Sequence, residues 1–312
     1  MVSPQSQTVF HVLGRRLTLI GCPDELIQAL EADWLFVHHQ LPEVAYNLTI
    51  RCGPGPLPML NSGQSVSVHA MQQQIPLLVS GSEVVYAPGG VPLLLAHFGV
   101  ESAEVRLCWP APLTRPTLAA LKIMVAESLR ISGLLPLHAA VACKDGETCA
   151  FFGPSGTGKS TTVLRAIAAG WTALAEDFVW VDPDTAQVYG WDRGIRLLPE
   201  SFVALPPEVA AQPWPQHADG KYWLPFTALQ GHRMSFESQG RALTQLALLE
   251  RRADLPSAWS DLPRRAALQL LWEAAGLAVT TLAVQRTGGQ IAVLLPKVKP
   301  LRLVLGSTPL PL

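Results

Sequence analysis

The chain has 312 residues, 49% of them hydrophobic, and its 23 basic residues stand against 24 acidic ones for a formal net charge of −1. A chain of this length and apolar content can bury a core, as one large domain or two ordinary ones. The near-neutral balance, without a block of like charges, argues against nucleic acid as a partner.

The cysteines and the apolar segments bear on the compartment. The five cysteines form no C-x-x-C pair, so we expect buried free thiols in a reducing compartment rather than a disulfide framework. The first residues lack the basic start and apolar run of a secretory signal. Prolines and glycines interrupt residues 75–100, the most apolar tract, which leaves less than the roughly 18 continuous apolar residues of a membrane span. We therefore expect a cytoplasmic protein with no membrane partner.

Residues 1–112 have the pattern of a smaller α+β domain. Strands are expected at 16–20, 45–51, 65–69, 75–79, 83–87 and 103–109, and a helix at 23–34. This half contains no recognisable catalytic motif, so its expected role is recognition of a substrate or partner. The run Pro110-Ala111-Pro112 predicts a linker, because proline favours extended chain. A second domain is expected over residues 113–312.

In that second domain, helical and strand patterns alternate. The patterns predict helices at 116–132, 160–169 and 263–275, and strands at 137–143, 148–152, 172–175, 178–181, 243–250, 278–284 and 290–294. Alternation of this kind is typical of an α/β fold.

A glycine-rich run, Gly-Pro-Ser-Gly-Thr-Gly-Lys-Ser, occupies residues 153–160 between a predicted strand and a predicted helix. In this pattern the glycines let backbone N–H groups surround phosphate oxygens, and the helix N-terminus adds positive charge. Lys159 is expected to neutralise the β- and γ-phosphates, and Ser160 to bind Mg²⁺. We therefore expect ATP and Mg²⁺ as ligands. The residues expected to contact the nucleotide are Gly153, Ser155, Gly156, Thr157, Gly158, Lys159, Ser160 and Thr161.

An acidic pair, Glu176-Asp177, follows this run by one predicted helix and one short strand. Transport and motor ATPases place their acidic residue further downstream and carry signatures such as Leu-Ser-Gly-Gly-Gln, which is not evident here. The short spacing predicts that the pair returns to the nucleotide, with one acid for the metal and one as base for an incoming hydroxyl. The alternative is a solvated turn, since Asp and Glu favour the surface.

Three segments together resemble a known family. Leu137-His138-Ala139-Ala140-Val141, residues 151–161 and Ala175-Glu176-Asp177 are similar to the core of the HPr serine kinases, whose fold is related to phosphoenolpyruvate carboxykinase. The chain looks most like the stand-alone members, which include kinases that phosphorylate lasso-peptide precursors on a serine. The likeness covers about residues 134–181. It implies an α/β fold whose C-terminal part is an HPr kinase-like P-loop domain with a mixed sheet.

The resemblance also implies roles for individual residues. Lys159 and Ser160 would hold the nucleotide and Mg²⁺, Asp177 would be the base, Glu176 would lie on the metal side, and His138 would neighbour the transferred phosphate. The first acid is usually Asp in the family and is Glu here, which leaves direct metal binding by Glu176 open. The longer glycine- and arginine-rich signature of the bifunctional enzymes is not found, which argues against HPr as the substrate and against a phosphorylase activity.

Further candidates are cationic or apolar. Arg193, Arg196 and Lys221 are available to stabilise transferring charge or to bind the nucleotide, and each is otherwise a surface residue. His138 has a similar alternative, since a histidine on an apolar strand is often a core residue. Tryptophans and prolines between residues 206 and 223 are suited either to closing over an acceptor or to filling the core.

The sequence thus predicts an ATP-dependent kinase that phosphorylates a serine or threonine hydroxyl of a peptide or protein. A small-molecule alcohol such as free serine or a sugar is an alternative acceptor. A nucleotide-binding regulator or ATPase without kinase activity is a third hypothesis, and carboxykinase chemistry is disfavoured because its Lys, His and Asp metal site is not evident. Related kinases assemble as oligomers, so a homo-oligomer is compatible with the resemblance.

Overall fold

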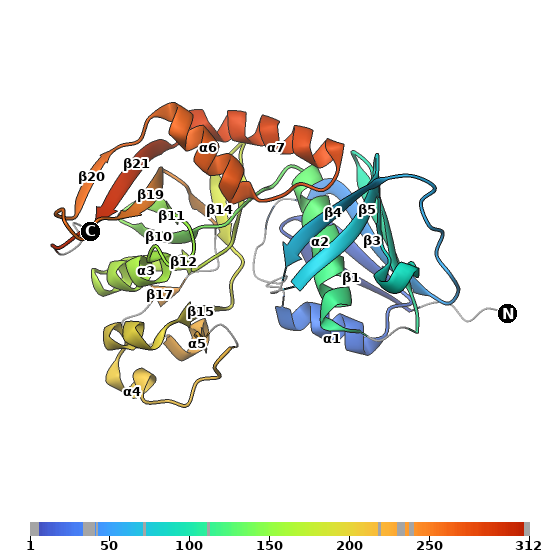
Figure 1. Cartoon of the computed structure of the whole chain (residues 1–312), viewed down its shortest axis with the longest axis horizontal. Coiled ribbons are helices and arrows are strands. Elements are labelled where there is room, and N and C mark those ends of the chain that lie inside the picture. Colours follow the sequence, from blue (N-terminus) through green and yellow to red (C-terminus); the bar gives the residue numbers. More distant parts are fainter. Residues whose placement is uncertain are drawn as a thin grey trace. The chain divides into compact units, whose positions relative to one another are not determined.

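The computed structural model describes residues 6–33, 41, 43–70, 73–110, 113–217, 220–229, 235–236 and 240–308. The chain is a mixed α/β protein whose sheets contain both parallel and antiparallel strand pairs (Figure 1). It divides into two compact units, Met1–Leu134 with Leu277–Gly289, and Leu135–Gly276 with Gln290–Leu312. Among the described helices, none is long and apolar enough to cross a membrane.

The first unit is built on an eight-stranded sheet in the order β1-β2-β3-β8-β7-β6-β5-β4. Its strands are β1 (Gln7–Val12), β2 (Arg15–Ile20), β3 (Val44–Gly53), β4 (Gln64–Ala70), β5 (Gln73–Ser80), β6 (Glu83–Tyr86), β7 (Leu94–Phe98) and β8 (Ser102–Cys108). The pairs β2–β3 and β3–β8 are parallel and the others are antiparallel. Helices α1 (Asp24–Asp33) and α2 (Arg115–Ile131) and the short η1 (Pro88–Gly90) complete this part of the unit.

Helix α2 belongs with this sheet because its apolar side packs against β4, β5, β7 and β8. The helix begins at a capping residue, Thr114, whose hydroxyl accepts the Thr117 N–H at 3.3 Å. In β8, alternate residues are buried, namely Ala103, Val105 and Leu107, as a half-covered strand requires. The unit division therefore falls at residues 134 and 135, whereas the expected domain boundary lies at residues 112 and 113.

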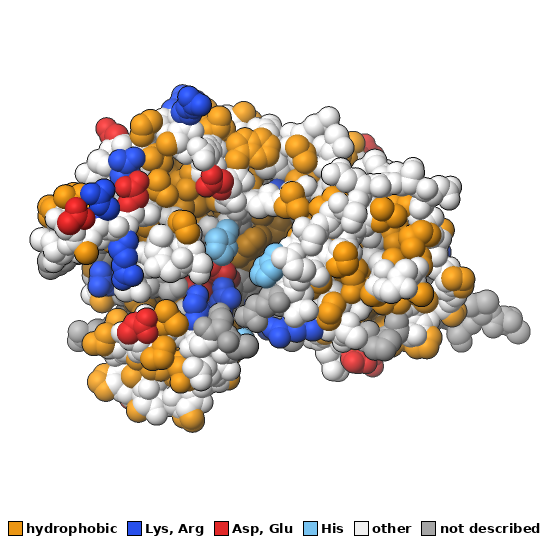
Figure 2. Space-filling view, viewed as in Figure 1, with side chains coloured by type: hydrophobic (Ala, Val, Ile, Leu, Met, Phe, Trp, Pro, Cys, Tyr) orange, Lys and Arg blue, Asp and Glu red, His pale blue; other side chains and the backbone are white. Residues whose placement is uncertain are grey.

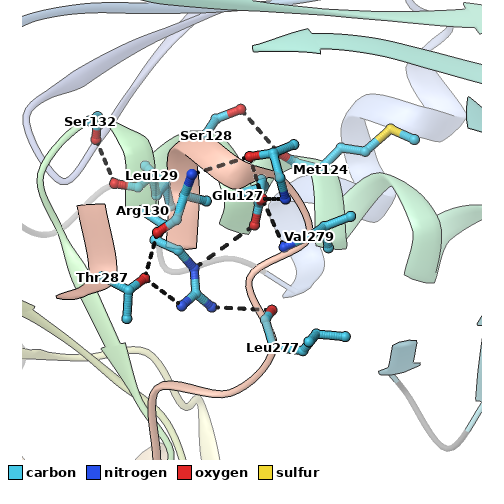
Figure 3. A network of polar contacts seen from close by, with 11 residues as sticks. Met124, Glu127, Ser128, Leu129, Arg130, Ser132, Leu277, Val279 and Thr287 are labelled. Atoms are coloured by element: carbon cyan, nitrogen blue, oxygen red, sulfur yellow. Dashed lines mark hydrogen bonds and ion pairs between the residues drawn. The ribbon is translucent and has the colours of Figure 1, made fainter. Parts of the chain in front are cut away.

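A buried charged network joins α2 to the segment that returns to the first unit (Figure 3). The Glu127 carboxylate accepts the N–H groups of Val279 (2.9 Å) and Thr280 (2.6 Å) and the Thr280 hydroxyl (2.9 Å). Arg130 lies one turn along α2, with its Nε 3.9 Å from Glu127, and donates to the Thr287 hydroxyl at 3.1 Å. Burial raises the pKa of Glu127 and lowers that of Arg130. The network fixes the start of α7 (Thr281–Leu294) on α2.

Replacing Glu127 should therefore destabilise the first unit. In Glu127→Ala the buried N–H groups and the Arg130 charge lose their acceptor, and breaking such a pair costs about 3–5 kcal/mol. The matched control is Glu104→Ala, because Glu104 pairs with Arg51 at 3.3 Å but both side chains are nearly half exposed, and such pairs contribute about 0–1 kcal/mol. Denaturant unfolding followed by circular dichroism measures both. Equal losses in the two variants would contradict this account.

Within its described residues, the second unit contains three sheets. The largest has seven strands in the order β17-β12-β10-β11-β19-β21-β20, the next has four in the order β18-β14-β13-β9, and β15 pairs with β16. The strands are β9 (Leu135–Leu137), β10 (Ala140–Lys144), β11 (Glu147–Phe152), β12 (Thr172–Ala175), β13 (Val179–Asp182), β14 (Gln187–Gly190), β15 (Gly194–Leu197), β16 (Tyr222–Pro225), β17 (Ser235–Phe236), β18 (Arg241–Ala242), β19 (Gln245–Arg251), β20 (Ala258–Asp261) and β21 (Lys299–Leu305). The helices are α3 (Lys159–Ala168), η2 (Pro199–Ala204), α4 (Pro207–Ala210), α5 (Phe226–Leu229), α6 (Arg264–Ala275), the end of α7, and η3 (Leu295–Lys297).

Helices cover both faces of the seven-stranded sheet, with α3 on one side and α6 on the other (Figure 1). The alternation of side chains along β11 produces this arrangement. Cys149 and Phe151 enter the cluster that contains α3, whereas Ala150 and Phe152 enter the cluster that contains α6. Because both faces are buried, β11 is a continuous apolar run from Cys149 to Phe152, as expected for a central strand.

Most of the expected elements are present within a few residues, and three strand predictions are wrong. Residues 137–143 do not form one strand, because β9 and β10 belong to different sheets and the chain breaks at residues 138 and 139. Residues 278–284 and 290–294 form no strands, because residues 281–294 are the helix α7. Its buried residues, Ala283, Thr287, Gln290, Ile291 and Leu294, recur at helical spacing, which the β-branched composition concealed.

Several strands were not predicted, among them β1, β7 and most of those between residues 187 and 261. The expected positions Trp34 and Ala111-Pro112 lie outside the described residues. All five cysteines are free, and Cys22, Cys52 and Cys149 are buried whereas Cys108 and Cys143 are partly exposed. The prediction of free thiols is thus confirmed, and that of burial holds for three of them.

Candidate functional site

Three chain segments meet at one edge of the seven-stranded sheet. β11 ends there and continues into the glycine-rich loop, residues 153–160, and β12 ends there and continues into the acidic pair. Between them, β10 runs in the opposite direction. Its first residues therefore pair with the last residues of both neighbours, Ala140 with Phe151 and Val141 with Ala175. His138, just before β10, is brought to the same edge.

The glycine-rich loop closes tightly before α3. Gly156 has a φ of 85° and Gly158, which caps α3, a φ of 104°, and glycine adopts such angles at little cost. The Thr157 hydroxyl donates to the Pro154 carbonyl at 2.7 Å. The loop thus contains Gly153, Ser155, Gly156, Thr157 and Gly158, and the first turn of α3 contains Lys159, Ser160 and Thr161. A helix N-terminus at this point carries partial positive charge and attracts anions.

Lys159 is buried and folds back over the loop. Its Nζ donates to the Gly153 carbonyl at 2.9 Å. Burial lowers the pKa of Lys159, and the negative charges of Asp177 and Glu176 oppose that shift. The ammonium group is thus already turned toward the interior of the loop, with two carboxylates near it.

Glu176 is the buried member of the acidic pair. The Ser160 hydroxyl donates a hydrogen bond to its Oε1, so the longer side chain of Glu reaches the first turn of α3. Burial raises the pKa of Glu176, the nearby charge of Asp177 raises it further, and the Ser160 hydrogen bond lowers it. A hydroxyl and a carboxylate are the oxygen donors that suit Mg²⁺. Among the described residues no cluster of three or more His, Cys, Asp or Glu side chains is arranged to hold a metal.

Asp177 lies between the side chains of His138 and Arg196 and is more accessible than Glu176. Its Oδ1 is 3.3 Å from His138 Nε2, and its Oδ2 accepts a hydrogen bond from Arg196. The Asp177 side chain is 24% exposed and that of His138 is 49% exposed. Burial lowers the pKa of His138, whereas the Asp177 charge raises it. His138 is therefore not a core residue, and its Nε2 faces the carboxylate.

The cations come from the small sheet of β15 and β16. Arg196 is in β15 and also lies 3.9 Å from Glu176 Oε2 through its Nε. Lys221 precedes β16, and its charge acts on His138, Lys159 and Glu176. Arg193 is exposed, and its carbonyl accepts the Phe226 N–H at 3.0 Å. Both Arg196 and Lys221 thus belong to the same group of charges as the loop and the acidic pair.

The positive charge of the site is local. On the face drawn in Figure 2, Lys and Arg side chains are interspersed with acidic and hydrophobic ones, and the described residues visible there form no broad surface of one sign.

Sequence reasoning missed one acidic residue of the site, Asp192. Its carboxylate Oδ2 accepts the backbone N–H groups of Glu176 (2.8 Å), Asp177 (2.6 Å) and Phe178 (3.1 Å). The residue as a whole is partly exposed, but its carboxyl group is enclosed. Burial raises the pKa of Asp192 to about 7, and the charges of Glu176 and Asp177 add to that shift. No local pattern could have identified it, because its partners are backbone groups of a distant segment.

No family model matches the chain, and no curated protein matches it significantly.

If the loop binds a nucleotide, Lys159→Ala should weaken the binding of ATP. A hydrogen bond to a charged group contributes about 1.5–3 kcal/mol, so we expect the Kd to rise roughly 10- to 100-fold. Lys144→Ala is the matched control, because Lys144 also donates to a backbone carbonyl, that of Ala169 at 2.8 Å, but lies at the opposite end of the β10–β11 hairpin. Isothermal titration with Mg·ATP measures both. An unchanged Kd in Lys159→Ala would contradict nucleotide binding by this loop.

Proposed function

We propose that the protein is a Mg·ATP-dependent kinase that transfers the γ-phosphoryl group to a serine or threonine hydroxyl of a peptide or protein. In this proposal the second unit is an HPr kinase-like P-loop domain. The observation that carries it is the convergence of the glycine-rich loop, the pair Glu176-Asp177 and His138 at one sheet edge. A loop alone supports nucleotide binding, whereas an accessible carboxylate beside it supports transfer to a hydroxyl.

On the nucleotide side, the loop amides and the N-terminus of α3 would hold the β- and γ-phosphates. Lys159 would exchange the Gly153 carbonyl for a phosphate oxygen, which is the better partner for an ammonium group. Ser160 and Glu176 would hold Mg²⁺, which draws negative charge from the phosphates. The hydrogen bond between these two side chains brings their oxygens together before the metal arrives.

On the acceptor side, Asp177 would take the proton of the attacking hydroxyl. The acceptor oxygen forms a bond to the γ-phosphorus while the bond from that phosphorus to the β,γ-bridging oxygen breaks, which releases ADP. The ion pair with Arg196 and the contact with His138 hold the Asp177 carboxylate in a fixed orientation. Arg196 and Lys221 would offset charge on the transferring group.

The exposure of the acceptor side favours a peptide or protein over a small molecule. The side chains of His138 and Arg196 are 49% and 34% exposed, so a residue carried by a larger chain has access to Asp177. Small-molecule sites instead enclose most of their ligand.

Asp177→Asn should abolish transfer while ATP still binds. The amide cannot take the proton, and removal of a general base costs about 10²- to 10⁴-fold in kcat. Asp182→Asn is the control, because Asp182 ends β13 and its carboxylate accepts the backbone N–H of Asp184 at 2.9 Å. Nucleotide titration and turnover measured side by side separate binding from transfer. Transfer at the wild-type rate in Asp177→Asn would show that this base assignment is wrong.

The class of acceptor can be identified by incubating the protein with γ-labelled ATP and either a peptide fraction or a cell extract. We expect label on a peptide or protein, in an acid-stable form typical of a serine or threonine ester. Label on a metabolite would instead select a small-molecule kinase. Release of labelled phosphate alone, with every fraction tested, would reject the kinase and favour an ATPase.

A further inference from the structure

The turn that carries the acidic pair is held by a single carboxylate oxygen. Three consecutive backbone N–H groups, those of Glu176, Asp177 and Phe178, donate to Oδ2 of Asp192 at 2.8, 2.6 and 3.1 Å. We propose that Asp192 is a positioning residue, which aims Glu176 at Ser160 and Asp177 at His138 through these three hydrogen bonds. Its effect on catalysis rests on the kinase function proposed above, whereas the hydrogen bonds do not.

The strand topology explains why the N–H groups of residues 176–178 need a hydrogen-bond acceptor outside the sheets. β12 ends at Ala175 and β13 begins at Val179, and these strands belong to different sheets. The residues between them therefore have no strand partner for their N–H groups. Water would satisfy those groups but would leave the turn free to rotate, whereas three hydrogen bonds to one carboxyl oxygen held by the fold fix its direction. With Asp192 in place, the side chains of residues 176 and 177 leave the turn in fixed directions.

Asp192 is itself held rigidly from the β14 side. Gly190, the last residue of β14, lies so close to β12 that a Cβ there would be 1.9 Å from the Leu174 carbonyl oxygen. The next residue, Trp191, donates its N–H to the Phe178 carbonyl at 3.1 Å, and its ring meets Trp180 edge-on at 5.9 Å. The backbone on both sides of the acidic turn is thus tied to the segment that presents Asp192.

The segment that contains Asp192 continues into β15, which carries Arg196. Four residues after Asp192, Arg196 in β15 bonds Asp177. A shift of Asp192 would therefore displace Asp177 and Arg196 relative to each other. Because all three N–H groups already donate to Asp192, this turn would not serve as a second anion site.

A positioning role differs from a merely structural one in what a substitution changes. Misplacing a catalytic group by about 1 Å costs roughly 100-fold in rate. Asp192→Ala should therefore lower the turnover of γ-labelled ATP about 100-fold at saturating ATP, while the Kd for ATP changes less than about threefold because Lys159 and the loop are intact. Asp192→Asn keeps an acceptor oxygen of the same shape, so we expect it to lose no more than about tenfold.

Thr244→Val is the matched control for lost stability. The Thr244 hydroxyl accepts the Thr148 N–H at 2.9 Å and donates to the Thr148 carbonyl at 3.0 Å, and both residues lie at the end of β11 and β19 remote from the loop. This variant should lower the melting temperature with no change in turnover. Equal losses of turnover in Thr244→Val and Asp192→Ala would assign Asp192 a structural role only and overturn the proposal.

Hydrogen exchange of the full chain, read by mass spectrometry over residues 175–179, tests the hydrogen bonds without any assay of activity. Asp192→Ala should speed exchange at the three amides, and unchanged exchange would overturn the positioning role.

If Asp192→Ala fails to fold, the variant Asp192→Glu tests the positioning role instead. It moves the carboxylate by one methylene, which should lower turnover at least about tenfold with unchanged ATP affinity. Full turnover in Asp192→Glu would also overturn the proposal. If the wild-type protein turns over no ATP, both the kinase function and the effect of Asp192 on catalysis are refuted. If Asp192→Ala is fully active, only the positioning role of Asp192 is refuted.

Discussion

The candidate site depends on the direction of three neighbouring strands. Because β10 runs against both β11 and β12, one sheet edge receives the ends of two strands and the beginning of the third. That edge alone brings the glycine-rich loop, the acidic pair and His138 together. Three parallel strands would have sent the residues before β10 to the far edge. The hairpin between β10 and β11 is thus as much a determinant of the site as the loop sequence.

A second constraint is the concentration of negative charge. Glu176 and Asp177 lie in one turn, and the carboxylate of Asp192 accepts hydrogen bonds from the backbone of that turn. Like charges this close to one another repel. The structure offsets them by distinct means: a hydroxyl on Glu176, an arginine and a histidine on Asp177, and three backbone amides on Asp192. Each carboxylate therefore has its own environment, which is the condition under which neighbouring acids take different roles. An incoming phosphate would compete for Lys159 and Ser160 but leave the amides on Asp192 undisturbed.

The sequence predicted the parts of the site that local patterns encode and missed those that depend on tertiary contacts. The loop, α3 and the acidic pair follow within a short stretch, so their glycines, apolar spacing and charges could be interpreted together. The break in the strand at His138 could not be predicted from such patterns, because it arises where the chain passes from one sheet to another. Residues 281–294 resemble strands in their β-branched residues, yet burial on one side makes them a helix. Arg196 was one of three candidate cations, and its ion pairs with Glu176 and Asp177, which depend on the tertiary structure, distinguish it.

The two units use a buried carboxylate in the same way but with different consequences. In the first unit, Glu127 accepts consecutive N–H groups at the start of α7, and Arg130 from the same helix balances its charge. The backbone that it fixes presents Val279 and Thr280, which are buried and have no ionisable group. In the second unit, Asp192 fixes a turn whose side chains are themselves carboxylates aimed at a hydroxyl, a histidine and an arginine. An anchor of the first kind contributes only stability, whereas one of the second kind also fixes side chains that the proposed kinase would use, so we expect substitution at Asp192 to change the rate more than the affinity for nucleotide.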